Sequence, residues 1–455
     1  MSEKKRATVH YLNARSSHMN ESLVVKMMAV AEAAGIESII SPGDVVGIKL
    51  HMGEWNNTAY IRPVYVRQLV DKVKQLGGRP FVTDCTCLPY MPYASRTTAL
   101  DYQLTAERNG FTSATLGAPV IIADGWLGND DVRVDLPEGV ILKEQYIGAA
   151  IAHCDALIVL THFKGHPMGT FGGAIKNVGV GCASKRGKLN LHMGKHPNYG
   201  VSAGEFYPQM CKGKECEKWK QCIDSCPTEA LEITDKSIIW HKELCIGCWD
   251  HIFASMCPTF LGMNLRDGLE AAGAAIADSA LATVKTIGRE KMLFINLAID
   301  ITPWCDCISW SDSQIISDLG VFASTDIVAI DKCCLDKAKA APGLRNSVAE
   351  LKGAMDPGIA KFASCGSLLS VSENIQINSG VFNGMGTHLY KIKQSKKIPD
   401  LRYNLKSKPV GPELKKALQL QWLIPEGGFK REDTIDLERL RWPLEEEKEE
   451  TSEEE

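Results

Sequence analysis

The sequence has no apolar run that reaches the roughly 18 residues needed to span a bilayer. Residues 1–17 carry charges with no apolar stretch behind them, which is not the pattern of a secretory signal. Positive charge is not in excess either, since 51 Lys and Arg face 55 Asp and Glu for a formal net charge of −4. That balance argues against a general nucleic-acid binder. We therefore predict a cytoplasmic protein with no membrane span and no nucleic-acid partner.

Two common phosphate-binding motifs are also missing. The chain contains no G-x-x-x-x-G-K-[ST] sequence, and no G-x-G-x-x-G follows an expected strand. A P-loop and a dinucleotide fingerprint therefore have no support. The composition is otherwise that of a globular protein, with 45% hydrophobic and 23% charged residues among 455. A chain of this length can bury a large core.

Cysteine, by contrast, is plentiful, with 16 residues in total. Without an export signal, we interpret these cysteines as metal ligands in a reducing cytoplasm rather than as disulfides. Seven lie between residues 211 and 258, and two of them, Cys226 and Cys257, are followed by proline. C-x3-C and C-x2-C spacings that end in Cys-Pro are typical of bacterial ferredoxins. They favour iron–sulfur clusters over zinc, and such oxygen-sensitive groups suggest an anaerobic host.

The cysteine spacings predict two ligand sets. One [4Fe-4S] cluster is expected on Cys211, Cys216, Cys222 and Cys257. A second cluster is expected to have three corners on Cys226, Cys245 and Cys248. His251 stands where the eighth cysteine would be, with Asp250 beside it, and imidazole can replace a thiolate on iron. The alternatives are a three-iron second cluster or a single cluster, although we favour two [4Fe-4S] clusters.

Expected strands and helices alternate around this stretch. Strands are predicted over residues 7–11, 45–50, 80–84, 119–123, 155–161 and 291–299, and helices over 20–34, 63–76, 95–109 and 266–289. The alternation predicts an α/β fold with a mostly parallel sheet and flanking helices, interrupted by an inserted bacterial-ferredoxin-like α+β module. The expected divisions are an α/β domain at 1–204 and 263–345, the module at 205–262, a C-terminal extension at 346–440 and an acidic disordered tail at 441–455.

A second chemically dense stretch, residues 161–196, follows the clearest strand. It contains eight glycines and four histidines at the carboxyl end of a parallel strand, where α/β sheets place their ligands. Such a density of cations and imidazoles suits an anionic ligand, a metal or both, although a solvated glycine-rich loop is the alternative. We predict His166 as proton donor or acceptor, with His162 and Lys176 as further catalytic candidates. The predicted cofactor- or substrate-binding residues are Lys49, His51, Gly172, Gly173, Lys176, Lys185, Arg186, Lys188 and His192.

Four further cysteines form two C-x-C pairs, Cys85 with Cys87 and Cys305 with Cys307. On a strand, both thiols of such a pair face one side and could share a metal or form a redox pair. The alternative is that they are buried thiols, which pack as small apolar groups.

Two acids and two more cysteines lie in the run STDIVAIDKCC. Asp326 and Asp331 are expected in cap or turn roles rather than in catalysis. Cys333 and Cys334 lie in a helical pattern and are expected to be structural.

Four segments together resemble a known family. They are GDVVGIKLH, CDALIVLTHFKGHPMGTFGGAIKNVGVGC, the cysteine block and ITPWCDCISWSDSQIISDLGVFASTDIVAID, within residues 40–340. They look like the iron–sulfur family catalogued as domain of unknown function 362. The resemblance implies an iron–sulfur protein and leaves its reaction open.

The stretch ALIVLTHFKGHPMGTFGGAIKNVGVG is also similar to part of the nickel-pincer lactate racemases. In that family a strand leads to a histidine, then to a glycine-rich turn and then to a lysine. The resemblance implies an acid/base role for His166, attachment of the pincer cofactor for Lys176 and nickel binding for His192. It also implies a shared fold and pocket.

Three functional hypotheses follow. The first is an iron–sulfur oxidoreductase that passes electrons between its clusters and a small anionic substrate or cofactor at residues 161–196, served by a redox partner protein. The second is a non-enzymatic electron-transfer or maturation protein. The third is a nickel-pincer-like hydride-transfer isomerase.

Overall fold

The computed structural model describes residues 6–17, 19–88, 95–199, 206–246, 257, 259, 265–394, 425–432 and 434. The chain divides into two units, residues 1–403 and 404–455. The second unit is described only at 425–432 and 434, which form no helix or strand. No helix among the described residues is long and apolar enough to cross a membrane.

An eight-stranded sheet lies at the centre of the first unit, in the order β14-β1-β13-β12-β7-β2-β3-β4. Neighbours from β12 to β4 pair in parallel, whereas β13 is antiparallel to both β12 and β1. This sheet confirms the predicted α/β class with mostly parallel strands. Its strands are β1 Ala7–Asn13, β2 Val45–Lys49, β3 Arg79–Asp84, β4 Val120–Ile122, β7 Ala156–His162, β12 Met292–Ala298, β13 Gly320–Ser324 and β14 Tyr390–Gln394.

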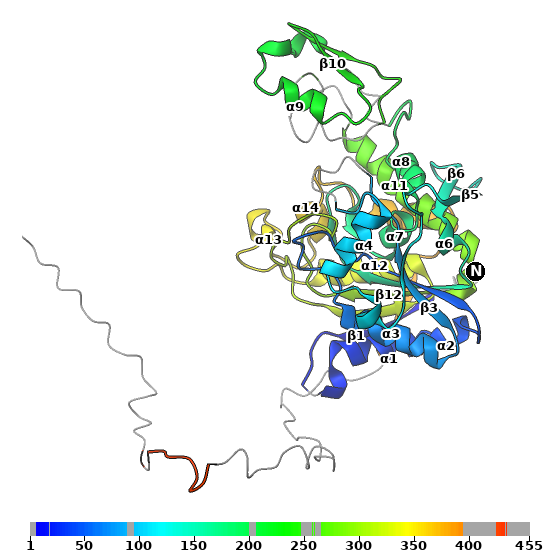
Figure 1. Cartoon of the computed structure of the whole chain (residues 1–455), viewed down its shortest axis with the longest axis vertical. Helices are drawn as coiled ribbons and strands as arrows, with labels where there is room; N and C mark the ends of the chain where they lie inside the picture. Colours follow the sequence, from blue (N-terminus) through cyan, green and yellow to red (C-terminus); the bar gives the residue numbers. More distant parts are fainter. Residues whose placement is uncertain are drawn as a thin grey trace, which may run out of the picture. The chain divides into compact units, whose positions relative to one another are not determined.

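Helices cover both faces of the sheet, with α1 and α3 on one side and α7 and α11 on the other (Figure 1). Four longer helices form where the sequence pattern predicts them, but α1 and α4 start three to four residues later. Ser22 caps α1 by accepting from the amide of Val25, and Thr98 caps α4 by accepting from the amide of Asp101. The α-helices are α1 Leu23–Ala33, α2 Ile36–Ile39, α3 Pro63–Gln75, α4 Ala99–Arg108, α5 Ser113–Leu116, α6 Ala149–Ala152, α7 Ala174–Gly179, α8 Lys185–Leu191, α9 Trp219–Asp224, α11 Leu265–Ile287, α12 Ile327–Ala340, α13 Val348–Leu351, α14 Lys361–Cys365 and α15 Asn374–Phe382.

The strand β7 shows why the sheet is buried on both sides. Leu157 and Val159 belong to the hydrophobic core on the α7 side, and Ile158 and Leu160 belong to the core on the α3 side. Both faces are covered by helices, so the strand is apolar at consecutive positions instead of alternating.

The order of the strands creates a switch point between β2 and β7. The chain leaves β2 through α3 and enters β3 on one side, whereas it leaves β7 and later enters β12 on the other side. Open α/β sheets bind their ligands at the carboxyl ends of the strands at such a point. The fold therefore directs the loops after β2 and β7 to the same crevice.

Three short strand pairs lie outside the main sheet. They are β5 Asp131–Asp135 with β6 Glu144–Gly148, β8 Lys164–His166 with β9 Thr170–Gly172, and β10 Leu231–Ile233 with β11 Ile238–Trp240. The β10–β11 pair and α9 lie in the predicted cluster module, where Leu231, Ile238 and Trp240 form a small core with Leu269 of α11. That this module is ferredoxin-like stays a prediction.

Residues that the sequence places in a C-terminal extension join the main unit. The strand β14 pairs in parallel with β1 at the edge of the sheet, and α15 packs on α11. The polar, glycine-rich composition of this region hides these elements from a search for apolar periodicity.

Candidate functional site

A cavity of about 240 Å³ lies where three parallel strands end. Lys49 is the last residue of β2, Asp84 the last of β3 and His162 the last of β7. The cavity therefore occupies the switch point of the sheet. Its charged, polar and sulfur-bearing lining residues are Lys49, His51, Asp84, Cys85, Cys87, Arg96, His162, Lys164, His166, Met168, Lys176, Asn177, Lys188, His192 and Cys307.

Most of the candidate residues outside the cysteine module line this one cavity. Those brought together are Lys49, His51, Cys85, Cys87, His162, His166, Gly173, Lys176, Lys188, His192 and Cys307. Lys185 and Arg186 do not line it, because Lys185 donates to backbone carbonyls and Arg186 pairs with Asp131 at 2.8 Å. Gly172 lies in β9, where a Cβ would stand 3.3 Å from the side chain of Lys164.

Three cations at the cavity are paired with buried carboxylates. Each pair joins residues from different loops or strand ends, so the pairs hold the wall of the cavity together. They are Lys49 with Asp84 at 2.9 Å, Arg96 with Glu54 at 2.9 Å and Lys164 with Asp306 at 3.2 Å.

The ammonium groups of Lys176 and Lys188 have no carboxylate partner among the described residues. Lys176 has no hydrogen-bond or ion-pair partner within the described parts of the chain, although its side chain is buried. Burial, and after it the charge of Lys164, lowers the pKa of Lys176 to about 7. Lys188 donates to the carbonyl of Ala183 at 2.5 Å. The cavity therefore has more positive charge than the surrounding carboxylates neutralise.

Both ring nitrogens of His162 are engaged. Its Nδ1 lies 2.7 Å from a carboxylate oxygen of Asp306, and its Nε2 lies 2.8 Å from the carbonyl oxygen of Ile299. Both partners are oxygen atoms, so neither ring nitrogen is left for a ligand. His162 is thus held between Asp306 and the Ile299 carbonyl, and its catalytic role stays a prediction.

His166 keeps one nitrogen available. Its Nδ1 accepts a hydrogen bond from the amide of Gly169 at 2.8 Å. Burial, and then the charges of two nearby lysines, hold the pKa of His166 well below its ordinary value. The ring is therefore neutral, with its proton on Nε2, and it can donate a hydrogen bond from that atom.

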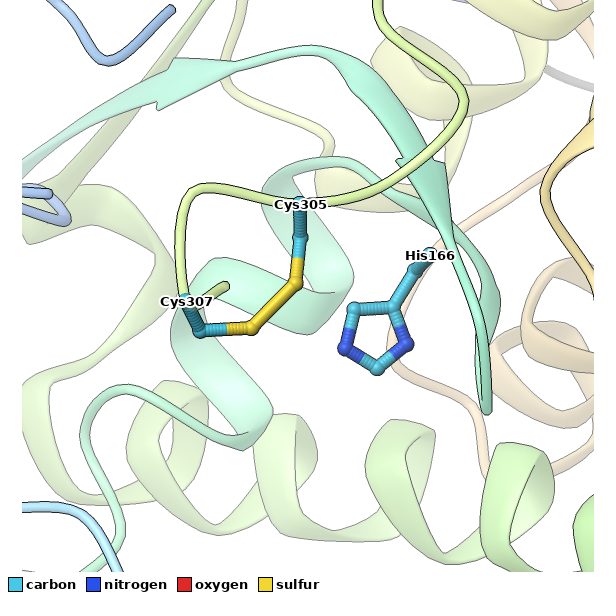
Figure 2. Close-up of side chains that lie close together, drawn as sticks. All are labelled: His166, Cys305 and Cys307. Atoms are coloured by element: carbon cyan, nitrogen blue, oxygen red, sulfur yellow. A yellow bond between two sulfur atoms is a disulfide. The ribbon is translucent and has the colours of Figure 1, made fainter. Parts of the chain in front are cut away.

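The imidazole of His166 lies beside the disulfide between Cys305 and Cys307 (Figure 2). A nitrogen of this ring and the two sulfurs lie within 4.8 Å of one another. The pair is in the loop between β12 and β13 and not on a strand. The other predicted pair, Cys85 and Cys87, directly follows β3 as free buried thiols whose pKa burial raises.

Two more histidines present unpartnered nitrogens. Nδ1 of His51 accepts from the amide of Gly53 at 3.0 Å, whereas its buried Nε2 has no partner among the described residues. Nδ1 of His192 is likewise buried without a partner there. Burial lowers the pKa of His192 to about 4, with the charges of Lys188 and Lys176 adding to it, so this ring is neutral. Because Nδ1 of His51 accepts a hydrogen bond and burial keeps this ring neutral, its Nε2 carries the proton and suits a ligand that accepts a hydrogen bond. Nδ1 of His192 suits a polar ligand atom.

The helix α7, which carries Lys176, is fixed by a buried cap. Asp331 of α12 accepts hydrogen bonds from the amides of Ala174 and Ile175, both at 2.8 Å. A Cβ on Gly173 would stand 2.5 Å from that carboxylate, so only glycine fits there. The expectation that Asp331 has a cap role is confirmed. The amides at this helix start are consequently not free for a ligand.

In the cysteine module, three predicted ligands lie close enough to the fourth, Cys222, to act on it electrostatically. Burial raises the pKa of Cys222, and the neighbouring charges of Cys257, Cys216 and Cys211 raise it further. Backbone amides donate to two of the module's sulfurs, those of Cys211 at 3.3 Å and Cys226 at 3.1 Å. Cys245 is buried in the module's core. The predicted ligands Cys248 and His251, with Asp250, lie outside the described residues.

Sequence reasoning missed several residues of the site. Asp306 lies between two candidate cysteines, and Asp84 ends a predicted strand, so both had a positional signal. Arg96 and Glu54 had none, because they lie in irregular segments and meet only through the fold.

A family model described as "Domain of unknown function (DUF362)" matches residues 46–336. No curated protein matches the chain. The lactate racemase apoprotein from Thermoanaerobacterium thermosaccharolyticum is 11% identical with a TM-score of 0.32, over 65% of this chain and 51% of the racemase. A crystallised Thermotoga maritima protein is 11% identical with a TM-score of 0.32, over 63% of this chain and 52% of its own. This chain spans about half the length of both structures.

Proposed function

The chain belongs to the family of domain of unknown function 362, as its sequence predicted, and we propose that it is an iron–sulfur oxidoreductase with a small anionic substrate or cofactor in its cavity. The observation that carries this proposal is the unneutralised positive charge of the cavity. Lys176 lines the cavity, is buried and has no acid partner among the described residues. A buried charge is costly unless it is paired, so a negatively charged ligand would relieve that cost.

The size and lining of the cavity limit the ligand. A volume of about 240 Å³ suits a small molecule. Lys176 and Lys188 would bind its acidic group, and the unpartnered nitrogens of His51 and His192 would orient it. His166 would donate a hydrogen bond from Nε2 to the reacting part of the ligand.

The cysteine module fits an iron–sulfur group on two observations. Cys211, Cys216 and Cys257 lie close enough to Cys222 to raise its pKa, and backbone amides donate to the sulfurs of Cys211 and Cys226 as they do around clusters. Cys211, Cys216, Cys222 and Cys257 would hold that cluster, and Cys226 and Cys245 would contribute to a second. Such a group supplies one-electron transfer when it is bound.

One residue connects the two parts of the proposal. Met168 lines the cavity and also packs against the small hydrophobic core that includes Cys245, on which Cys211, Cys226 and Cys257 pack as well. The turn between β8 and β9, which carries Met168, therefore touches both the cavity and the core on which the module's cysteines pack. This contact supports a functional connection between the module and the cavity.

The proposal is tested by binding and metal analysis on anaerobically purified full-length protein. Iron and sulfide should be present at about four to eight per chain, with a cluster signal in the EPR spectrum. Glycolate, as a small anionic probe, should bind with an affinity that falls about tenfold or more in Lys176→Met. Lys185→Met is the matched control, because Lys185 donates to backbone carbonyls outside the cavity and should leave binding unchanged. Protein without iron, or equal glycolate binding by both variants, would refute the proposal.

A second candidate is a pincer-type hydride-transfer isomerase. The observation that favours it is that His166, Lys176 and His192, the three positions matched to racemase residues, line one cavity. Nickel bound together with iron in the purified protein would support this candidate. Protein that lacks nickel and in which mass spectrometry shows Lys176 unmodified would exclude this candidate.

A further inference from the structure

The loop that carries Cys305 and Cys307 is held rigidly against the cavity wall. The amide of Gly165 in β8 donates to the carbonyl of Thr302 at 2.9 Å, and the indole of Trp304 donates to the carbonyl of Gly366 at 3.1 Å. A Cβ at Gly165 would stand 1.9 Å from the carbonyl oxygen of Pro303, so β8 and the loop approach as closely as glycine allows. These contacts fix the backbone that carries Cys305 and Cys307 beside the cavity.

The two sulfurs differ in access. Cys305 is 1% exposed, whereas Cys307 is partly exposed and lines the cavity. A thiolate in the cavity can therefore attack the sulfur of Cys307, and the buried sulfur of Cys305 is the leaving group. Thiol–disulfide exchange depends on which sulfur is attacked and on how well the leaving thiolate is stabilised.

His166 is oriented to stabilise that leaving thiolate. Its Nδ1 faces the amide of Gly169, so the ring proton is on Nε2, and Figure 2 shows the opposite edge of the ring turned toward the disulfide. A neutral imidazole that donates from Nε2 can stabilise a developing anion. The same geometry disfavours a metal at these three residues, because a metal on Nε2 would leave a proton on Nδ1, against the amide donor.

We propose that Cys305 and Cys307 form a redox-active disulfide that exchanges with small thiols bearing an acidic group. The inference rests on the proposed anion-binding function of the cavity and names its substrate class. Lys176 and Lys188 line the cavity together with Cys307, and neither has a carboxylate partner among the described residues. An acidic group on the thiol would bind these ammonium groups and bring its sulfur to Cys307.

The exchange consists of two successive attacks by substrate thiolates. The thiolate of one substrate, its proton lost to water, attacks Sγ of Cys307 and forms a mixed disulfide. The bond between the two protein sulfurs breaks, and its electron pair leaves on Cys305, which accepts a hydrogen bond from His166 and takes a proton from water. A second substrate thiolate attacks the substrate sulfur of the mixed disulfide and releases Cys307, which also takes a proton. Two thiols are oxidised to one disulfide, and the protein disulfide is reduced to two thiols.

The test compares three small thiols of different charge on anaerobically purified full-length protein that has been oxidised with hydroxyethyl disulfide. Thioglycolate carries a carboxylate, 2-mercaptoethanol is neutral and cysteamine carries an ammonium group. The readout is the rate at which Cys305 and Cys307 become alkylatable, measured by mass spectrometry and divided by the thiolate concentration. Thioglycolate should be faster than 2-mercaptoethanol by about tenfold, and cysteamine should be slowest. The buried Cys333 and Cys334 serve as internal controls and should stay unreactive.

Variants separate charge recognition from chemistry. Lys176→Met should remove the preference for thioglycolate, whereas Lys185→Met should keep it. His166→Gln should slow all three thiols to a similar extent and leave the preference intact. Absence of a disulfide in the oxidised protein, equal rates for the three thiols, or a preference that survives Lys176→Met would overturn the inference. Glycolate binding that depends on Lys176, without any exchange, would overturn the inference alone and leave the proposed function standing.

Discussion

At the scale of single residues, the ammonium group of Lys176 is the most informative feature of the cavity. Its pKa is lowered from 10.5 to about 7, mainly by burial. Near neutral pH about half of the folded molecules therefore carry a protonated Lys176, and a bound anion would favour the protonated form. Lys164, its neighbour, is neutralised by Asp306.

Anion binding should depend on pH through this group. Below about pH 7 Lys176 is protonated and attracts an anion, and above it the charge is lost. Glycolate affinity should thus be constant at acidic pH and fall by up to about tenfold per pH unit above the pKa of Lys176. Calorimetric titration across this range checks the slope. Lys176→Met should show weak, pH-independent binding, and a slope retained in that variant would assign the dependence to another group.

The same pKa predicts an effect on folding stability. In the unfolded chain Lys176 titrates near 10.5, so between about 7 and 10.5 the unfolded state binds more protons than the folded state. The free energy of unfolding of the ligand-free protein should consequently rise with pH in this window. Below about pH 7, the folded state carries the full destabilisation of the buried charge. Lys176→Met should raise the free energy of unfolding by about 2 kcal/mol at neutral pH. Chemical denaturation of the ligand-free protein measures this change, and a destabilised variant would contradict it.

At the scale of secondary-structure elements, the sequence predicted most of what surrounds the cavity. The apolar runs at 45–50 and 155–161 became β2 and β7, and the histidines and lysines after β7 reached the cavity because strand ends share one edge. The pairing of β14 with β1 could not be predicted in this way. It joins two segments at opposite ends of the unit, and four of the five β14 residues are exposed, so no apolar pattern marks it.

The cap of α7 gives a test at this scale. Asp331→Asn should remove one of two carboxylate–amide bonds and turn an amide donor toward a backbone donor, at a cost of about 1–3 kcal/mol in stability. The shift of α7 should also move Lys176 and weaken glycolate binding. Asp326→Asn is the matched control, because Asp326 caps α12 by accepting from two amides away from the cavity. Both variants should melt at lower temperature, but only Asp331→Asn should bind glycolate more weakly. Equal glycolate affinity in the two variants would show that the cap of α7 does not position the ligand site.

At the scale of the whole molecule, the proposed function has two parts, the cavity and the cysteine module, and the sequence alone could not relate them. Motif spacing predicts which cysteines act together, because the ligands of one cluster follow a fixed order. It does not predict that Met168, seven residues after Thr161, would line the cavity and also pack against the core that includes Cys245. Such a contact depends on how the turn between β8 and β9 is held, which no local pattern encodes.

The two parts should be separable by mutation. Cys222→Ser removes one of four neighbouring thiols in the module, so iron and sulfide should fall by about one cluster, or four irons per chain. Cys222 does not line the cavity, and glycolate should therefore bind with unchanged affinity. Reduction of a bound ligand by a one-electron donor should be lost, because the electron supply is interrupted while the ligand site remains.

The matched control for this experiment is Cys154→Ser. Cys154 is a buried thiol of the α/β core that donates to the carbonyl of Ala156 and takes no part in the module. Its replacement should leave the iron content, glycolate affinity and electron transfer as they are. An iron content unchanged in Cys222→Ser would remove this cysteine from the predicted ligands. A glycolate affinity that falls together with the iron would show that the module builds the ligand site instead of supplying electrons to it.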